Sequence, residues 1–137
     1  AAYFEIKAIL SVIGAGSAYL AASTGELAEA VVELASPEKM PLVETHAMYA
    51  MATITVFSIL AGSYLYESLY KVKKLRGLKK LPLLPVLSKY IQKFAPVLAL
   101  IGLVLITVTG GLGASIVYGP EVDPFVTFIY NTFTTLK

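Results

Sequence analysis

The sequence predicts an all-α integral membrane protein, a single membrane domain in which three transmembrane helices form a bundle and a C-terminal amphipathic helix follows them. The 137 residues are 57% hydrophobic and only 15% charged, whereas soluble domains carry about 25% charged residues. The apolar residues gather into three runs, at about 8–34, 42–66 and 94–118. Each run is long enough to cross the hydrocarbon core of a bilayer as a helix.

The boundaries of the three runs carry helix start and stop signals. Ser36-Pro37 ends the first run, Pro41 precedes the second, and Gly119-Pro120 stops the third. Proline is favoured in the first turn of a helix and cannot continue one from within. In hydrocarbon each run must be helical, because every backbone N–H and C=O group needs a partner inside its own segment.

The segment between the second and third runs is strongly basic. Residues 71–93 hold eight of the eleven positive charges and no acidic residue. Between two spans, such a loop indicates the cytoplasmic side of a cell membrane, so we expect the lipid bilayer and no nucleic acid as its partner. Apolar residues in the same loop indicate a short helix along the interface: Leu83, Leu84, Val86, Leu87 and Ile91.

The tail, residues 121–137, is too short to span a membrane and is expected outside the cell. It carries an apolar stripe at helical spacing after Pro124: Phe125, Phe128, Ile129 and Phe133. We expect this interfacial tail to form one amphipathic helix that lies on the outer membrane surface or packs on a partner.

His46, the only histidine, is the first candidate site residue. It lies about one turn into the second run, near the outer interface, and shares a helix face with Tyr49 and Thr53. Polar groups in membrane helices usually face the bundle interior. Three interpretations stay open: a packing residue bonded to another helix, an axial ligand to the iron of haem b, or a hydrogen-bond donor to a quinone. A second haem ligand would come from a partner or a copy of the chain, since Met48 and Met51 lie off the His46 face.

Two further groups of residues are predicted at a similar depth. Glu26 is the first charged residue within the first run, and Glu44 follows the next turn, so they form either a polar or proton-relay site or solvated helix ends. The third run contains a glycine cluster, which permits close helix packing or leaves room for a flat cofactor: Gly110, Gly111 and Gly113. His46, Tyr49 and these glycines are the predicted cofactor-binding residues.

Several motifs occur in a recognisable order: Thr24-Gly25-Glu26, then His46, then Thr109-Gly110-Gly111-Leu112-Gly113, then Val117-Tyr118-Gly119. Over about residues 8–123 the sequence resembles a widespread domain-of-unknown-function family of predicted four-helix membrane proteins, often found beside cytochromes in bacteria and archaea. The resemblance implies a four-helix bundle, histidines near one membrane face and a link to haem. His46 is the family histidine that can be carried over, and the family's first helix has no counterpart in this sequence.

We therefore expect a small accessory subunit of a membrane redox or respiratory complex, which contributes to haem b or quinone binding and serves electron transport together with other membrane subunits or copies of itself. The alternative is a structural subunit of a filament or pilus, or a purely scaffolding membrane subunit, which the missing initiator Met and the aromatic tail favour. Ala1 leaves open whether Met alone, a signal or a helix was removed. A transporter would need several copies. The chain has no cysteine and no catalytic motif, so we expect no enzyme activity from it alone.

Overall fold

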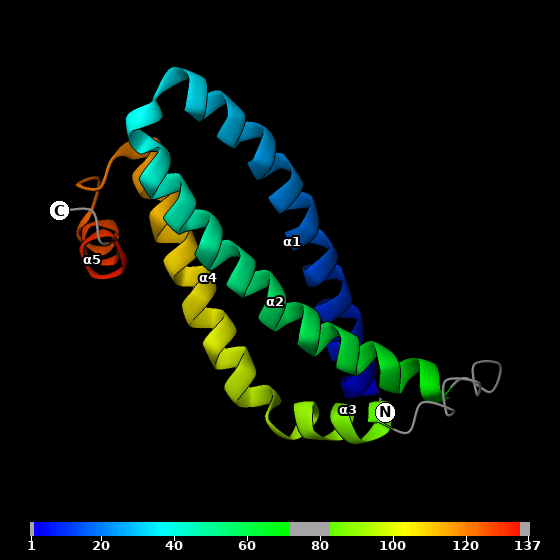
Figure 1. Cartoon of the computed structure of the whole chain (residues 1–137). Helices are drawn as coiled ribbons and strands as arrows, with labels where there is room; N and C mark the ends of the chain where they lie inside the picture. The colour runs from blue at the N-terminus through cyan, green and yellow to red at the C-terminus, as the bar shows by residue number, and fades with distance from the viewer. Residues whose placement is uncertain (1, 72–82, 135–137) are drawn as a thin grey trace. The chain divides into compact units, whose positions relative to one another are not determined.

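The computed structural model describes residues 2–71 and 83–134, and over these ranges it is helical, with no strand. Its elements are α1 (Ala2–Ala35), the 3-10 turn η1 (Pro37–Lys39), α2 (Met40–Lys71), α3 (Leu83–Lys93), α4 (Ala95–Tyr118) and α5 (Pro124–Phe133) (Figure 1). Helices α1, α2 and α4 are long and apolar enough to cross a membrane. The all-helical class, the three apolar helices and the helix in the tail are thereby confirmed.

The helix ends follow the local signals in the sequence. After α4, Gly119 has φ +94 and its N–H donates to the carbonyl of Ser115 at 3.0 Å, a left-handed cap that glycine adopts without strain. Asp123 then caps α5, since its carboxylate accepts from the backbone N–H groups of Phe125 at 2.8 Å and Val126 at 2.9 Å. Such a cap stabilises a helix by about 1 kcal/mol. The α2 helix continues to Lys71, about one turn past the predicted end.

The described chain forms two compact units, and each of the three long helices contributes to both. The first unit comprises Ala1–Tyr19 and Ile54–Gly102. Its core is built from one small cluster of buried side chains: Ala8, Leu60, Tyr64 and Ala95. The ring of Phe4 meets that of Tyr64 edge to face, with centroids 5.5 Å apart.

Hydrogen bonds attach α3 to α2 within the first unit. Ser88 is buried, and its hydroxyl lies 3.3 Å from both the carbonyl oxygen of Ser63 and a carboxylate oxygen of Glu67. The amide of Gln92 donates to the same Ser63 carbonyl at 3.3 Å. The short helix predicted in the basic segment is therefore α3, whereas the lysines and the arginine between 72 and 82 lie outside the described residues.

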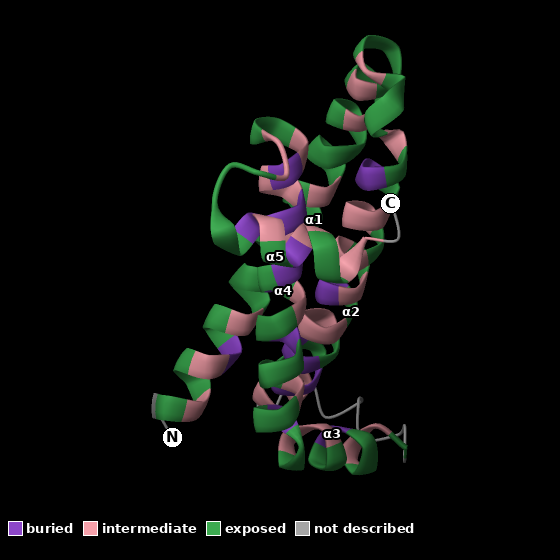
Figure 2. Ribbon diagram, turned by 90° about the vertical axis from the view of Figure 1, so that its left-hand side faces the viewer, coloured by how far each residue is buried: buried purple, intermediate pink, exposed green. Residues whose placement is uncertain are grey.

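The second unit comprises Leu20–Thr53 and Leu103–Lys137. Its core contains residues of α2, α4 and α5: Leu42, Val108, Leu112 and Ile129. Leu112 is fully buried. The α5 helix packs against α4 of its own chain through Ile129, and it carries both buried and exposed residues (Figure 2). Val126 is buried as well, while Phe125 and Phe128 stay exposed. Of the predicted apolar stripe, Ile129 and Phe133 therefore lie on the packed face of α5, whereas Phe125 and Phe128 do not.

Candidate functional site

His46 lies in the second turn of α2 and reaches across to α4. Its Nδ1 atom is 3.0 Å from the carbonyl oxygen of Thr109. Because a carbonyl oxygen only accepts hydrogen bonds, Nδ1 must carry a proton and donate it. In the neutral ring, Nε2 is then the atom with a free lone pair. Among the described residues, no group forms a hydrogen bond with Nε2.

Gly113 allows the imidazole to lie against α4. It comes one turn after Thr109, and a Cβ atom at position 113 would be 3.2 Å from Cε1 of His46 and 3.6 Å from Nδ1. An alanine at position 113 would therefore fit only if the imidazole of His46 moved slightly. The space left by the absent side chain of Gly113 is therefore occupied by His46 itself.

Two threonines continue the polar contact between α2 and α4. The hydroxyls of Thr53 and Thr109 are 3.3 Å apart. Each also donates to a carbonyl in its own helix at 2.8 Å, Thr53 to Tyr49 and Thr109 to Leu105. Because a hydroxyl has a single proton, these local bonds compete with the contact between the helices. His46, Thr53 and Thr109 together form a polar seam within an otherwise apolar helix pair.

The other predicted cofactor-binding residues have separate surroundings. Tyr49 stacks edge to face on Phe133 of α5, with ring centroids 5.7 Å apart and an interplanar angle of 85°. Gly111 lies under Ile129, where an added Cβ would be 2.8–3.0 Å from three side-chain atoms. Gly110 is exposed, and a Cβ there would meet nothing within 4 Å. Close helix packing thus explains Gly111 and Gly113 and does not explain Gly110.

The predicted carboxylates are exposed. Neither Glu26 in α1 nor Glu44 in α2 forms a hydrogen bond or ion pair with a described residue. Over residues 2–71 and 83–134, no group of three or more His, Cys, Asp or Glu side chains is placed to hold a metal ion. Met48 and Met51 are 60% and 58% exposed, in keeping with their positions off the His46 face.

Sequence reasoning identified His46 and the polar face of its helix but not the group that it binds. The partner is a backbone carbonyl, which has no side-chain signature. The four-residue spacing of Thr109 and Gly113 was a weak signal for this contact. It places the Thr109 carbonyl one helical turn from a glycine, whose missing side chain leaves room for a ring. Also unforeseen is Lys39 of η1, whose ammonium donates to the carbonyl of Ile116 at 3.1 Å, near the end of α4.

Together these contacts describe a histidine held in one orientation by its Nδ1 proton, with a single ring nitrogen left to bind a proton, an iron ion or a hydroxyl group. Comparison with known proteins adds no relative: no protein-family model, no curated protein and no solved structure matches the chain.

Proposed function

We propose that the chain is an integral membrane protein whose helices α1, α2 and α4 cross the bilayer. The supporting observation is how little of its apolar surface the chain buries: in the most apolar stretches of α1, α2 and α4, only 11%, 28% and 22% of the residues are buried. Side chains such as Ile13, Leu20 and Leu103 are more than half exposed. Soluble proteins rarely expose continuous apolar surface of this kind to water, whereas lipid tails cover it.

The orientation that we propose follows the charge distribution. The basic segment 71–93 lies on the cytoplasmic side, and η1 and α5 lie outside. In α3 the buried Ser88 faces α2, while Leu83, Val86 and Leu87 are about half exposed or more. An amphipathic helix with exposed apolar side chains and lysines is suited to the headgroup layer.

Alkaline extraction tests the insertion. Membranes from cells that express the full chain are washed with sodium carbonate at high pH, which removes peripheral proteins but not integral ones. We expect the chain to remain in the pellet and to enter the supernatant only after detergent is added. Release by carbonate alone would contradict the proposed insertion.

Within the membrane, the role that we propose is that of an accessory subunit of a redox or respiratory complex, with His46 contributing to haem b or quinone binding and with no reaction catalysed by this chain alone. The bond from Nδ1 to the Thr109 carbonyl supports this role, because metal-binding histidines are commonly oriented by donating their other N–H to a backbone carbonyl. The resemblance to membrane proteins found beside cytochromes points the same way.

The described residues would fit haem only as the source of one ligand to its iron. The free lone pair on Nε2 is the required donor atom, but the spaces at Gly113 and Gly111 are filled by His46 and Ile129. The porphyrin and the second ligand would thus belong to a contact with another subunit or a copy of the chain. A bound haem would supply one-electron transfer. For a quinone, the same tautomer makes Nε2 an acceptor, which suits the hydroxyl of a quinol better than the carbonyl of a quinone.

A reduced-minus-oxidised visible spectrum of the natively purified complex tests this role. We expect a haem b signal that is lost in His46→Ala and weakened in Gly113→Ala, because the added methyl displaces the imidazole. Gly62→Ala in α2, which is not among the predicted cofactor-binding residues and has nothing within 4 Å of the new Cβ, is the matched control and should keep the full signal. Extraction and analysis of bound quinones tests the second cofactor. A complex with neither haem nor quinone, or a signal unaffected by His46→Ala, would contradict the redox role.

A scaffolding membrane subunit or a filament subunit is the second candidate. The observation that favours it is that the His46 bond to α4 is also what a packing residue forms, so the same contact serves helix association without any cofactor. Electron micrographs of purified material discriminate between the two structural forms. Ordered filaments would support the filament subunit, and discrete particles without haem or quinone would support the scaffold.

A further inference from the structure

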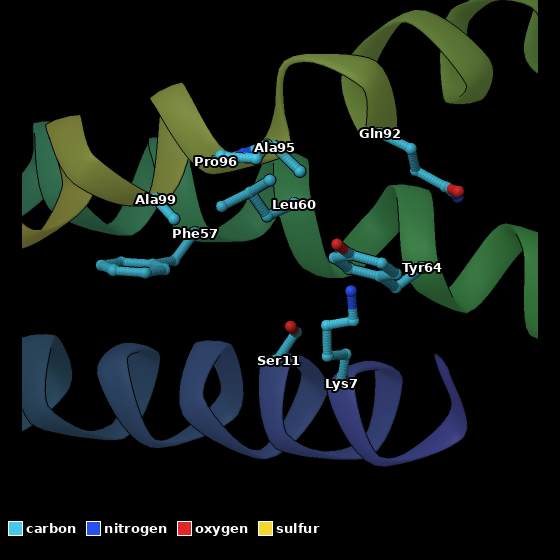
Figure 3. A pocket seen from close by; sticks show the side chains of 9 residues that line it. All are labelled: Lys7, Ser11, Phe57, Leu60, Tyr64, Gln92, Ala95, Pro96 and Ala99. Carbon is cyan, nitrogen blue, oxygen red and sulfur yellow. The ribbon is translucent and has the colours of Figure 1, made fainter. Parts of the chain in front are cut away.

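A pocket in the first unit, distinct from the His46 contact, has a cationic end and apolar walls. Its volume is about 380 Å³, at the lower end of the range of ligand pockets. Figure 3 shows Lys7 and Ser11 pointing from α1 toward the side chains of α2 and the first turns of α4. The pocket is not enclosed, so a ligand larger than its volume can extend beyond it.

The Lys7 ammonium at the cationic end has no anionic partner among the described residues. The ammonium of Lys7 lies 4.4 Å from the ring centroid of Tyr3 and 5.8 Å from that of Tyr64, and these aromatic faces hold the charge in place. Within residues 2–71 and 83–134, no carboxylate pairs with Lys7, and the hydroxyl of Ser11 forms no hydrogen bond. A partly buried ammonium in an apolar helix is usually paired with an anion, and the described residues supply none.

The apolar walls are fixed by packing. The ring of Phe57 lies directly on the backbone of α4, because a Cβ at Gly102 would be only 2.8 Å from its Cζ atom. Leu60 and Ala95 belong to the core of the unit. Ala99, one turn after Ala95 on α4, also lines the pocket and is exposed. An aliphatic chain would therefore contact ordered carbon surface next to the ammonium.

We propose that this pocket binds one anionic phospholipid, with its phosphate on the Lys7 ammonium and the Ser11 hydroxyl and part of one acyl chain along Phe57 and Ala99. This inference rests on the proposed membrane insertion. Charge complementarity selects the occupant, because a phosphate that bears a net negative charge satisfies Lys7, whereas a zwitterionic headgroup brings a second cation. The neighbouring α3 helix places exposed lysines and apolar side chains in the same unit, as expected for a segment at headgroup depth.

Native mass spectrometry of the full chain in detergent tests the proposal. The chain is titrated separately with phosphatidylglycerol, phosphatidylcholine and inorganic phosphate. We expect one phosphatidylglycerol per chain, about tenfold weaker binding of phosphatidylcholine, and no phosphate adduct. Equal binding of the two lipids would overturn the proposal. An adduct with inorganic phosphate as tight as that with the lipid would overturn it in favour of a free-anion site.

Matched variants locate the site. Lys7→Gln should weaken phosphatidylglycerol binding about tenfold, the loss of a hydrogen bond between charged groups. Lys89→Gln removes the same charge from an exposed position on α3 that does not line the pocket, and should weaken binding by about threefold or less. Equal losses in the two variants would indicate attraction by the surface as a whole and would contradict the assigned site.

A second pair of variants changes the size of a side chain in the pocket and leaves its charge unchanged. This pair tests the lipid site even if Lys7→Gln fails to fold. Ala99→Leu narrows the apolar end, whereas Ala21→Leu makes the same change at an exposed position of α1 outside the pocket. We expect weaker binding in the first variant alone, with equal helicity by circular dichroism. Carbonate extraction of each variant separates the two claims. A chain that stays in the membrane but does not select phosphatidylglycerol refutes only the lipid site, and a chain released by carbonate refutes the insertion on which it rests.

Discussion

Two adjacent glycines of α4 should respond in opposite directions to the same substitution. At Gly111 an added Cβ would lie 2.8 Å from Cγ2, 2.9 Å from Cβ and 3.0 Å from Cγ1 of Ile129. Ile129 is 3% exposed, and its branched Cβ is close to the backbone of α5, so relief requires a shift of the whole helix. At Gly110 an added Cβ would meet nothing within 4 Å.

The magnitudes follow from two opposing effects. Replacing glycine by alanine in a helix stabilises the folded state by about 0.5–1 kcal/mol, because the unfolded chain loses conformational freedom. Overpacking a filled contact costs about 1–3 kcal/mol. Gly110→Ala should therefore raise the free energy of unfolding by up to about 1 kcal/mol. Gly111→Ala should lower it by up to about 2 kcal/mol, the difference between the two effects.

The assay is reversible unfolding in mixed detergent micelles, followed by far-ultraviolet circular dichroism for both variants and the unsubstituted chain. Ile129→Ala provides an independent check. Its cost should be smaller in the Gly111→Ala background than alone, because the smaller side chain removes part of the clash. Equal effects of the two glycine substitutions, or additive effects of Gly111→Ala and Ile129→Ala, would refute the packing of α5 on α4.

Three further substitutions test contacts that position the helices. Asp123→Ala should lower the stability of α5 by about 1 kcal/mol, because the helix loses its N-terminal cap. Asp123→Asn keeps a capping oxygen and should change the stability little. Equal losses of stability for the two variants in thermal unfolding would contradict the cap. Ser88→Ala should cost about 1 kcal/mol, because it removes the hydroxyl next to Glu67 and leaves Gln92 as the remaining side-chain donor to the Ser63 carbonyl. Hydrogen exchange in α3 should rise while that in α5 stays unchanged. His46→Phe should cost about 0.5–1.5 kcal/mol through loss of the bond to Thr109, and unchanged unfolding would refute a structural role for that bond.

The positions of the helices could be predicted from the sequence because their signals are local. Ser36-Pro37 and Gly119-Pro120 lie where the chain leaves α1 and α4, and proline and glycine act on the backbone at their own positions. The three apolar runs correspond to helices for the same reason, since length and composition need no knowledge of the partner surface.

The contacts at the candidate site could not be predicted in the same way. Gly110, Gly111 and Gly113 look alike in sequence, yet successive helix positions point about 100° apart. One therefore faces outward, one lies under α5 and one lies beside His46. Their different roles depend on which side of α4 each neighbour covers, and this is a property of the packed helices. The composition of the cluster indicated only that close approach was possible.

The buried face of α5 shows a related limit. Its apolar residues recur at helical spacing, but several adjacent stripes satisfy that spacing, and the predicted stripe of Phe125, Phe128, Ile129 and Phe133 is one of them. Of these residues the structure buries Ile129 and packs Phe133 against the same core, leaves Phe125 and Phe128 exposed, and buries Val126 in addition. The branched side chain of Ile129 fills the space above Gly111. The spacing of apolar residues in the sequence does not determine how far α5 is rotated about its axis.

Membrane insertion and its orientation are tested most directly by labelling single cysteines in intact cells. The chain has no cysteine of its own, so Glu38→Cys in η1, Lys89→Cys in α3 and Leu103→Cys in α4 each introduce the sole thiol. With a membrane-impermeant maleimide, we predict labelling at position 38 in intact cells, at position 89 only after the cells are permeabilised, and at position 103 only after denaturation. Labelling at position 89 in intact cells, or at position 103 without denaturation, would contradict the proposed membrane protein and its orientation.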